Sequence, residues 1–188
     1  MENILKCLDI AGTPCKKFDN DKKYIATGDV LENKIANFEI VNYENKPSRA
    51  NLICEEGDII FAKMKDTVKV LEITKENQNN IYSTGFLCVK PKKEYYNRYI
   101  YWLINSKKFN EQKNKLSKGA TQKAINNENF KKINIKIEND YAKQKLIAKK
   151  IDLIHKIIID KTEQLKKLDE IVKSQFVENL FVNGLEVA

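Results

Sequence analysis

The last third of the sequence contains no residue that breaks a helix. From about Lys143 to Phe181, a stretch of 39 residues, there is neither proline nor glycine. Apolar residues recur there at spacings of 4, 3, 4, 7, 3 and 4, with Lys161 at the skipped position: Ile147, Ile151, Ile154, Ile158, Leu165, Leu168 and Val172. This is the spacing of a coiled-coil seam. It predicts one long helix over 140–182, followed by a tail at 183–188.

A helix of this length spans roughly 58 Å at about 1.5 Å per residue, which is too long for a domain of this size to cover. We therefore expect the seam to pair with a helix of another chain. Identical chains most commonly associate as two-fold dimers, so a homodimer is expected. The alternative is an amphipathic helix folded back on its own domain, because short heptad runs also occur in bundles within one chain.

Residues 1–139 carry short β-rich runs separated by turn signals. The segment NLICEEGDIIFAKM contains an apolar run, a Glu-Glu-Gly-Asp turn and a second apolar run, and VKVLEIT and IYSTGFLCVKP are further strand candidates. In INIKI, the residues Ile133, Ile135 and Ile137 alternate with polar ones, which is the period of a half-buried strand. These runs predict a domain rich in short strands.

One helix is expected among these strands, in the segment EYYNRYIYWLINSKKFNEQKNKL. Its apolar residues recur at three and four positions, and Gly119 follows as a natural stop: Tyr96, Tyr99, Ile100, Leu103 and Ile104 carry the period. Strands and helix together predict an α+β fold, with a mixed α/β domain over 1–139 ahead of the long helix.

Positive charge is concentrated in one segment. The chain has 34 basic and 26 acidic residues, a formal net charge of +8. Residues 107–136 alone hold nine lysines against Glu111 and Glu128, which gives 9 − 2 = +7. Such a balance favours an anionic partner, although a lysine-rich composition can also reflect solubility or genomic base bias.

The cysteines and the hydrophobic profile indicate the cellular compartment and redox environment that we expect for the protein. The four cysteines, Cys7, Cys15, Cys54 and Cys88, form no C-x-x-C pair and have apolar neighbours, so we expect reduced, buried thiols and neither a zinc site nor a disulfide framework. No apolar run approaches the roughly 18 residues of a membrane span, and the N-terminus lacks the pattern of a signal peptide. A cytoplasmic protein without a membrane partner is expected.

Catalytic motifs are hard to find. The single histidine, His155, lies within the coiled-coil stretch, and no G-x-G-x-x-G, Walker or G-x-S-x-G motif occurs. None of the three prolines adjoins another, so the Asn/Asp-Pro-Pro-aromatic loop of DNA methyltransferases is absent. We expect no catalytic residue, no cofactor and no metal. An alternative is a small metal-dependent nuclease that uses Asp29, Glu32 and Lys34.

Three polar and basic clusters in the first domain favour nucleic acid. The residues expected to contact DNA are Arg49, Lys63, Lys65, Lys69, Lys118, Thr121, Gln122 and Lys123. Arginine can read guanine edges and glutamine can bond to adenine in pairs, while lysines neutralise phosphates. Base contact is therefore expected of Arg49 and Gln122, and phosphate contact of the lysines. The alternative for 119–122 is a plain connection between elements.

The order of these features resembles a known family. The turn and strand EEGDIIFAKM, the segment STGFLCVKPKKEYYNRYIYWLINS, the loop GATQKAINNENFKKINIKI and a helix that runs from KQKLIAKKIDLI to LDEIVKSQFVENLF are similar to the specificity subunit of Type I restriction-modification systems. The chain departs from the usual pattern in two ways. IENDYAKQKL lacks the family's prolines and has Lys143 where the family has an acidic residue before the glutamine, and there is one recognition domain and one long helix where the family has two of each.

The resemblance implies a target recognition domain that binds double-stranded DNA, with the loop at 118–123 lying against the DNA and the strand at 133–137 anchoring it. It also implies a methyltransferase subunit as partner, which would supply S-adenosylmethionine and flip the base, and a place for a restriction or translocase subunit. The long helices of the family pair antiparallel. A homodimer of this kind would read one half-site twice, as an interrupted palindrome. The remaining alternative is a coiled-coil module that binds another protein.

Overall fold

The computed structural model describes residues 1–183, with side chains as far as residue 178. It divides into two compact units, residues 1–145 and residues 146 onward. The elements of the first unit are strands β1 (Glu2–Asn3), β2 (Leu8–Ala11), β3 (Lys22–Ile25), β4 (Val30–Leu31), β5 (Lys34–Ile35), β6 (Glu39–Val41), β7 (Ala50–Leu52), β8 (Ile59–Ala62), β9 (Val70–Glu72), β10 (Ile81–Ser83), β11 (Phe86–Pro91) and β12 (Asn134–Ile135), the 3-10 turn η1 (Ile4–Lys6), and helices α1 (Asn97–Asn105), α2 (Lys107–Leu116) and α3 (Asn127–Phe130). Helix α4 (Tyr141–Asn183) continues through the second unit.

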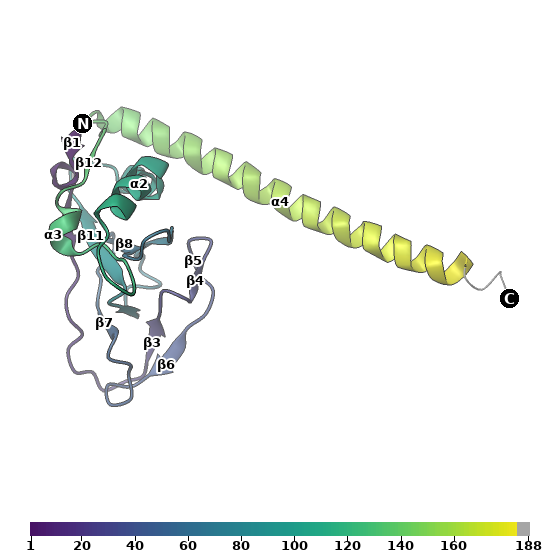
Figure 1. Ribbon diagram of the computed structural model, residues 1–188, viewed down its shortest axis with the longest axis horizontal. Coiled ribbons are helices and arrows are strands. Elements are labelled where there is room, and N and C mark those ends of the chain that lie inside the picture. Colours follow the sequence, from purple (N-terminus) through teal and green to yellow (C-terminus); the bar gives the residue numbers. More distant parts are fainter. Residues whose placement is uncertain (184–188) are drawn as a thin grey trace. The chain divides into compact units, whose positions relative to one another are not determined.

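The strands form two four-stranded sheets, in the orders β6-β3-β10-β7 and β2-β11-β8-β9, while β1 pairs with β12 and β4 with β5 (Figure 1). Pairing is antiparallel except between β10 and β3, which are parallel. Some strands that follow one another closely go to different sheets, as β7 and β8 do and β10 and β11 do, whereas β8 and β9 pair with each other. The expected α+β fold is confirmed.

The core lies where the two sheets face each other and where helices cover the second sheet. Strand β8 is buried along its whole length. Ile60 packs in a cluster with residues of both sheets, including Ile25 and Tyr82. Phe61, the next residue, contacts Phe109 of α2 with ring centroids 5.2 Å apart. The uninterrupted apolar run IIFA therefore has a physical cause, since both faces of β8 are covered.

The expected single helix over 94–116 is wrong, because the chain breaks it in two at Ser106. There the backbone is extended (ψ 148°) and the Ser106 hydroxyl accepts from the Phe109 N–H at 3.2 Å, which is the geometry of an N-cap. Helix α2 ends at Leu116, with Ser117 as C-cap, before Gly119 is reached. The expected alternation over 133–137 is confirmed, since Ile133, Ile135 and Ile137 are buried and the residues between them exposed.

Helix α4 begins at Tyr141, where the Asp140 carboxylate accepts from the Ala142 and Lys143 N–H groups at 2.8 and 3.1 Å. The buried Gln144 fixes this start within the first unit: its amide donates to the Glu138 carbonyl and accepts from the Tyr96 N–H at 2.7 Å. In the described part of the chain, no helix is both long and apolar enough to cross a membrane.

Candidate nucleic-acid interface

Two of the basic segments predicted from the sequence lie side by side in the fold. The Lys65 N–H donates to the Lys123 carbonyl at 2.9 Å, and the Ile125 N–H donates to the Lys63 carbonyl at 2.9 Å. Met64 and Ala124 form an antiparallel bridge between these bonds. The segments 63–65 and 123–125 therefore form a short ladder, in which Lys65 lies opposite Lys123 and both side chains are exposed.

The loop between 118 and 124 is closed by its own ends. Lys118 and Ala124 exchange two backbone hydrogen bonds, each 3.0 Å long. Gly119 has φ +139°, and a Cβ at this position would lie 2.4 Å from the Gln122 carbonyl oxygen. The turn thus requires glycine. The expected anchor at 133–137 is wrong, since the loop is held by 63–65 and strand β12 pairs with β1 instead.

The segment that carries Arg49 reaches the same surface through residues 84 and 85. The Thr84 N–H donates to the Arg49 carbonyl at 2.9 Å. The Lys63 N–H donates to the Gly85 carbonyl at 2.9 Å, and the Lys63 ammonium donates to the Thr84 carbonyl at 2.9 Å. All three clusters are therefore joined by backbone contacts. We call the exposed part of this assembly the basic loop surface: Arg49, Lys65, Lys118, Thr121, Gln122 and Lys123.

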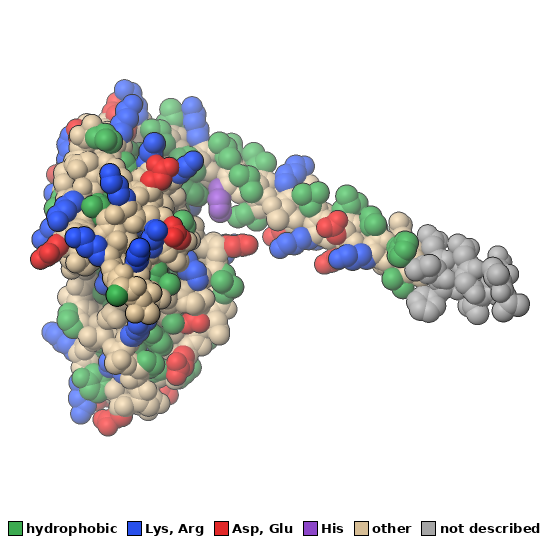
Figure 2. All heavy atoms as spheres, in the orientation of Figure 1, with side chains coloured by type: hydrophobic (Ala, Val, Ile, Leu, Met, Phe, Trp, Pro, Cys, Tyr) green, Lys and Arg blue, Asp and Glu red, His purple; other side chains and the backbone are tan. Residues whose placement is uncertain are grey.

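The cations of this surface are mostly free to meet an anion. Arg49, Lys118 and Lys123 make no ion pair with the residues that the structure describes, and Lys65 makes only a long one, 3.8 Å from Asp66. Of the nine lysines in 107–136, all but Lys113 are exposed. Figure 2 shows Lys and Arg side chains spread over the visible face of the first unit. A polyanion would meet little competition from internal carboxylates here.

Lys63 and Lys69, which were expected to contact phosphate, form hydrogen bonds to backbone carbonyls within the first unit. Both are half-buried, and their ammonium groups donate to the carbonyls of Thr84 and Thr27, the latter at 2.8 Å. Burial lowers the pKa of Lys63 below its ordinary value. These two bonds tie the loop at 63–69 to neighbouring segments, whereas Lys65, Lys118 and Lys123 are exposed.

Helix α2 holds the loop at 63–69 through hydrogen bonds from two of its side chains. Lys113 is 1 % exposed, and its ammonium donates to the Ala62 carbonyl at 3.4 Å and to the Thr67 carbonyl. Burial lowers the pKa of Lys113 to about 8. Its neighbour Asn114 exchanges two hydrogen bonds with Asp66, at 2.8 and 3.0 Å, where the backbone is left-handed (φ 59°). Lys113 is one of the nine lysines of 107–136, but its position four residues after the buried Phe109 places it on the inner face of α2.

Comparison with known proteins also connects this chain with DNA. Residues 6–171 match the family described as Type I restriction modification DNA specificity domain. The chain belongs to this family.

Relatives of this specificity domain are longer than the chain. It is 30 % identical over 88 residues to the Type I restriction enzyme HindI specificity subunit of Haemophilus influenzae, a match that covers 44 % of this chain and 19 % of that protein. Its fold is similar to the crystal structure of the HsdS subunit from Thermoanaerobacter tengcongensis, with a TM-score of 0.67, 17 % identity, and coverage of 82 % of this chain and 41 % of that one. A structure from work on complex assembly and conformational transition of the type I R-M system matches with a TM-score of 0.66 and 17 % identity over 96 % of this chain and 49 % of that one. The chain thus spans a fifth to a half of the length of these relatives.

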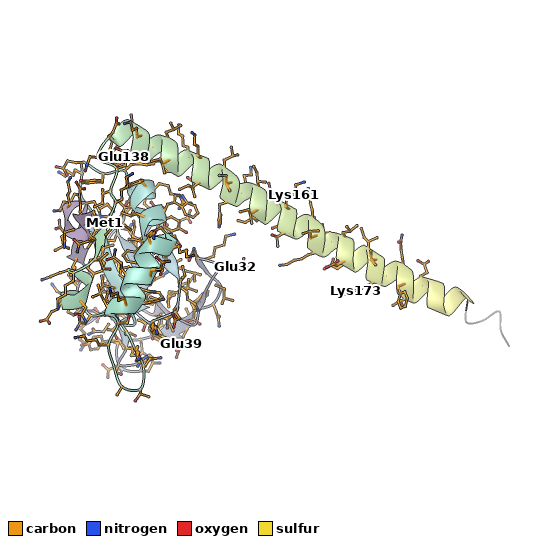
Figure 3. The ribbon with its side chains drawn as sticks, turned by 45° about the horizontal axis from the view of Figure 1, so that its top comes forward. Met1, Glu32, Glu39, Glu138, Lys161 and Lys173 are labelled. Atoms are coloured by element: carbon orange, nitrogen blue, oxygen red, sulfur yellow. The ribbon has the colours of Figure 1, made fainter. Side chains whose placement is uncertain are left out.

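Two of the three residues of the nuclease alternative, Asp29 and Glu32, form turns of the backbone. The Asp29 carboxylate accepts from the Ala26 N–H at 2.8 Å. Glu32, labelled in Figure 3, and Asn33 have φ of 49° and 60° and form the two-residue turn between β4 and β5. Within the described residues, the one group of three potential metal donors lies elsewhere, at Cys54, Asp58 and Cys88. Nothing in this geometry favours a nuclease.

The second unit presents apolar side chains along α4 (Figure 2). Five of the seven predicted seam residues are 56–62 % exposed: Ile154, Ile158, Leu165, Leu168 and Val172. Ile147 and Ile151 are half-buried, so the exposed seam begins later than predicted. Leu153, Ile157, Ile171 and Phe176 are at least half-exposed as well, which makes the seam a broad stripe. We call the five exposed seam residues and these four additional residues together the apolar stripe of α4.

Proposed function

We propose that this chain recognises duplex DNA for a Type I restriction-modification complex and has no catalytic activity of its own. The observation that carries the proposal is the convergence of three separate basic segments into the basic loop surface, in a chain of the DNA specificity family. A partner methyltransferase subunit would bind S-adenosylmethionine and flip the target base, and a restriction or translocase subunit would join the same complex.

The surface divides into two kinds of contact. Lys65, Lys118 and Lys123 carry mobile ammonium groups that suit phosphates, which fix the register of the protein on DNA without reading sequence. Arg49 and Gln122 carry paired donor or acceptor groups that suit base edges in the major groove. Lys63, Lys69 and Lys113 act indirectly, since their ammonium groups bond to backbone carbonyls and keep the loops in place.

The second part of the proposal is a homodimer formed through the apolar stripe of α4. Contiguous apolar surface on a helix marks an interaction site, and identical stripes can pair about a two-fold axis. If the helices pair antiparallel, each end of the paired helices carries the same recognition domain. The target would then be an interrupted palindrome whose spacer length is set by the helices.

The salt dependence of DNA binding tests the basic loop surface. We expect the triple variant Lys65→Ala, Lys118→Ala, Lys123→Ala to flatten the plot of log affinity against log salt by about 0.9 per lost phosphate contact, or about 2.7 in all. A matched triple variant of exposed lysines outside the surface, Lys17→Ala, Lys75→Ala, Lys93→Ala, should keep the wild-type slope. Binding is measured with the chain alone and with its methyltransferase subunit. Equal slopes for all three proteins would exclude this surface as the DNA footprint.

Base reading has a separate signature. Arg49→Ala or Gln122→Ala should relax the preference at one base position by roughly 1–3 kcal/mol while the salt slope falls little for Gln122→Ala. The measurement is competition among DNA duplexes that differ at single positions, and sequencing of methylated sites in a host with and without the gene supplies the target. An asymmetric methylated motif would contradict the homodimer and leave the basic loop surface unaffected.

A further inference from the structure

A cluster of three metal-binding side chains lies beneath the surface of the first unit. The Sγ atoms of Cys54 and Cys88 and a carboxylate oxygen of Asp58 all lie within 4.8 Å of one another. The three residues are 3 %, 1 % and 1 % exposed. They come from three places in the chain: Cys54 follows β7, Asp58 precedes β8 and Cys88 lies within β11. The fold therefore brings these three donors together, and they form no short sequence motif.

The contacts of Asp58 leave one of its oxygens unused. Its Oδ2 accepts from the Glu55 N–H at 2.9 Å and from the Cys88 thiol at 3.4 Å. Its Oδ1 is buried and accepts no hydrogen bond from any described residue. The nearest cation is the Lys90 ammonium, 4.0 Å from Oδ1, which also pairs with Glu55 at 2.5 Å. This buried carboxylate therefore has few partners, and its Oδ2, which faces the Cys88 sulfur, is the oxygen placed to bind a metal.

We propose that Cys54, Asp58 and Cys88 form a zinc site. In a tetrahedral site with Zn–S of about 2.3 Å and Zn–O of about 2.0 Å, the sulfur and oxygen ligands lie roughly 3.5 Å apart and the two sulfurs roughly 3.8 Å apart. The observed separations of 3.4 Å between Cys88 and Asp58, and of no more than 4.8 Å overall, require shifts of an ångström or less. The fourth ligand would be a water, because the Glu55 side chain is 77 % exposed and pairs with Lys90.

The charges of such a site balance. When Zn²⁺ binds, each thiol gives up its proton to solvent, so one divalent cation replaces two protons and the net charge of the cluster stays the same. The Lys90 ammonium continues to offset the Asp58 carboxylate. Burial beside Ile60, Tyr82 and Phe86 would shield the metal–thiolate bonds from water. Two thiolates in the donor set favour Zn²⁺ over Mg²⁺ or Ca²⁺, which prefer oxygen ligands.

The role of the metal would be structural. Cys54 lies on the connection that leaves β7, a strand of the first sheet, and Cys88 lies on β11 of the second sheet. A zinc ion held by both would link the two sheets at a point where Cys54 and Cys88 already make a side-chain hydrogen bond. The site is independent of the basic loop surface, so its failure would leave the proposed DNA recognition intact.

The test begins with protein freed of metal by a chelator and then dialysed against micromolar zinc. We expect one zinc per chain, and a raised midpoint of thermal unfolding that Mg²⁺ does not reproduce. Cys54→Ala and Cys88→Ala should each weaken zinc binding by roughly a hundredfold or more. Cys7→Ala is the matched control, because Cys7 is also a buried thiol but lies outside the cluster, and it should bind zinc as the wild type does.

A second measurement needs no variant and so does not depend on the variants folding. X-ray absorption at the zinc edge of the wild-type chain should show two sulfur ligands at about 2.3 Å with oxygen ligands completing the shell. Less than a tenth of an equivalent of zinc after dialysis, a shell without two sulfurs, or unchanged binding in Cys54→Ala and Cys88→Ala would each overturn the proposal and leave three ordinary core side chains.

Discussion

Branched apolar residues have opposite surroundings in the two units of this chain. In the first unit, Ile25, Ile60 and Ile100 are fully buried. On α4, Ile154 and Ile158 are each 57 % exposed and Leu165 is 62 % exposed. An isolated exposed leucine is ordinary, but nine apolar residues along one helix are not. The difference teaches that the first unit buries its own hydrophobic residues, whereas α4 leaves a stripe of them exposed, which is the basis for proposing a partner.

The largest expected effect comes from placing charge on the apolar stripe of α4. Ile158→Asp with Leu165→Asp should weaken self-association by roughly a thousandfold or more, about 4 kcal/mol, because each carboxylate would be buried without a partner in the dimer. Analytical ultracentrifugation measures the association constant. The first unit should keep its unfolding transition, since neither residue belongs to it.

The matched control adds charge to α4 away from the stripe. Lys156→Asp with Lys167→Asp changes the net charge by more than the test pair does, at exposed positions outside the stripe, and should leave the association constant within a few-fold of wild type. If the wild-type chain is monomeric at micromolar concentration without methyltransferase, the homodimer is contradicted. The stripe would then bind a different partner.

The next effect concerns the reverse case, a charged side chain that is buried in the first unit. The pKa of Lys113 is lowered to about 8 from an ordinary 10.5. Between these values the unfolded chain holds a proton that the folded chain has lost, so raising the pH through this window stabilises the fold. The contribution of Lys113 should grow by about 1.4 kcal/mol per pH unit, to about 3 kcal/mol in all.

Urea unfolding of the wild type and of Lys113→Met, from pH 7 to pH 10.5, isolates this contribution. Other groups titrate in both proteins, so the quantity to follow is the difference between their free energies of unfolding. That difference should shift in favour of the wild type as the pH rises. Lys108→Met, an exposed residue of the same helix, serves as the control and should show no such trend. A difference that is constant with pH would place Lys113 in contact with water.

The smallest expected effect is on the loop of the basic loop surface. Gly119→Ala should cost roughly 1–3 kcal/mol of stability, because a Cβ at φ +139° would lie 2.4 Å from the Gln122 carbonyl oxygen. A displaced loop should also reduce the salt slope of DNA binding by up to about 0.9. Gly28→Ala is the matched control, since a Cβ there meets no atom within 4 Å. Equal thermal stability of the two variants would show that the loop adapts freely.

Features with a local cause were predictable from the sequence. The alternation at 133–137 gave buried isoleucines, and the run without proline or glycine gave a helix from Tyr141 to Asn183. The break at Ser106 was missed because the apolar period of α1 continues weakly into α2, while the serine cap that interrupts it is a single hydrogen bond to Phe109. Periodicity describes which face is buried, and it is insensitive to a change of helix axis.

The arrangement of the candidate site was beyond a reading of the sequence. The three basic clusters were identified individually, but their meeting depends on bonds between residues about sixty positions apart, such as Lys65 to Lys123. The roles of Lys63, Lys69 and Lys113 depend on which carbonyl groups lie within reach of each ammonium. The four cysteines looked inert for the same reason: Cys54 and Cys88 are 34 residues apart in the chain and within 4.8 Å in the fold.

The pairing of β1 with β12 has a consequence for how the chain is made. Glu2 pairs with Ile135, so the first strand finds its partner only after the ribosome has released nearly all of the first unit. At about 5–20 residues per second, the start of the chain waits roughly 7–27 seconds for that partner. Strands β10 and β11, although close along the chain, belong to different sheets, so local pairs such as β4–β5 and β8–β9 can close as hairpins in the meantime but these two cannot. We expect folding to be slow and largely post-translational, with a window in which chaperones bind the nascent strands.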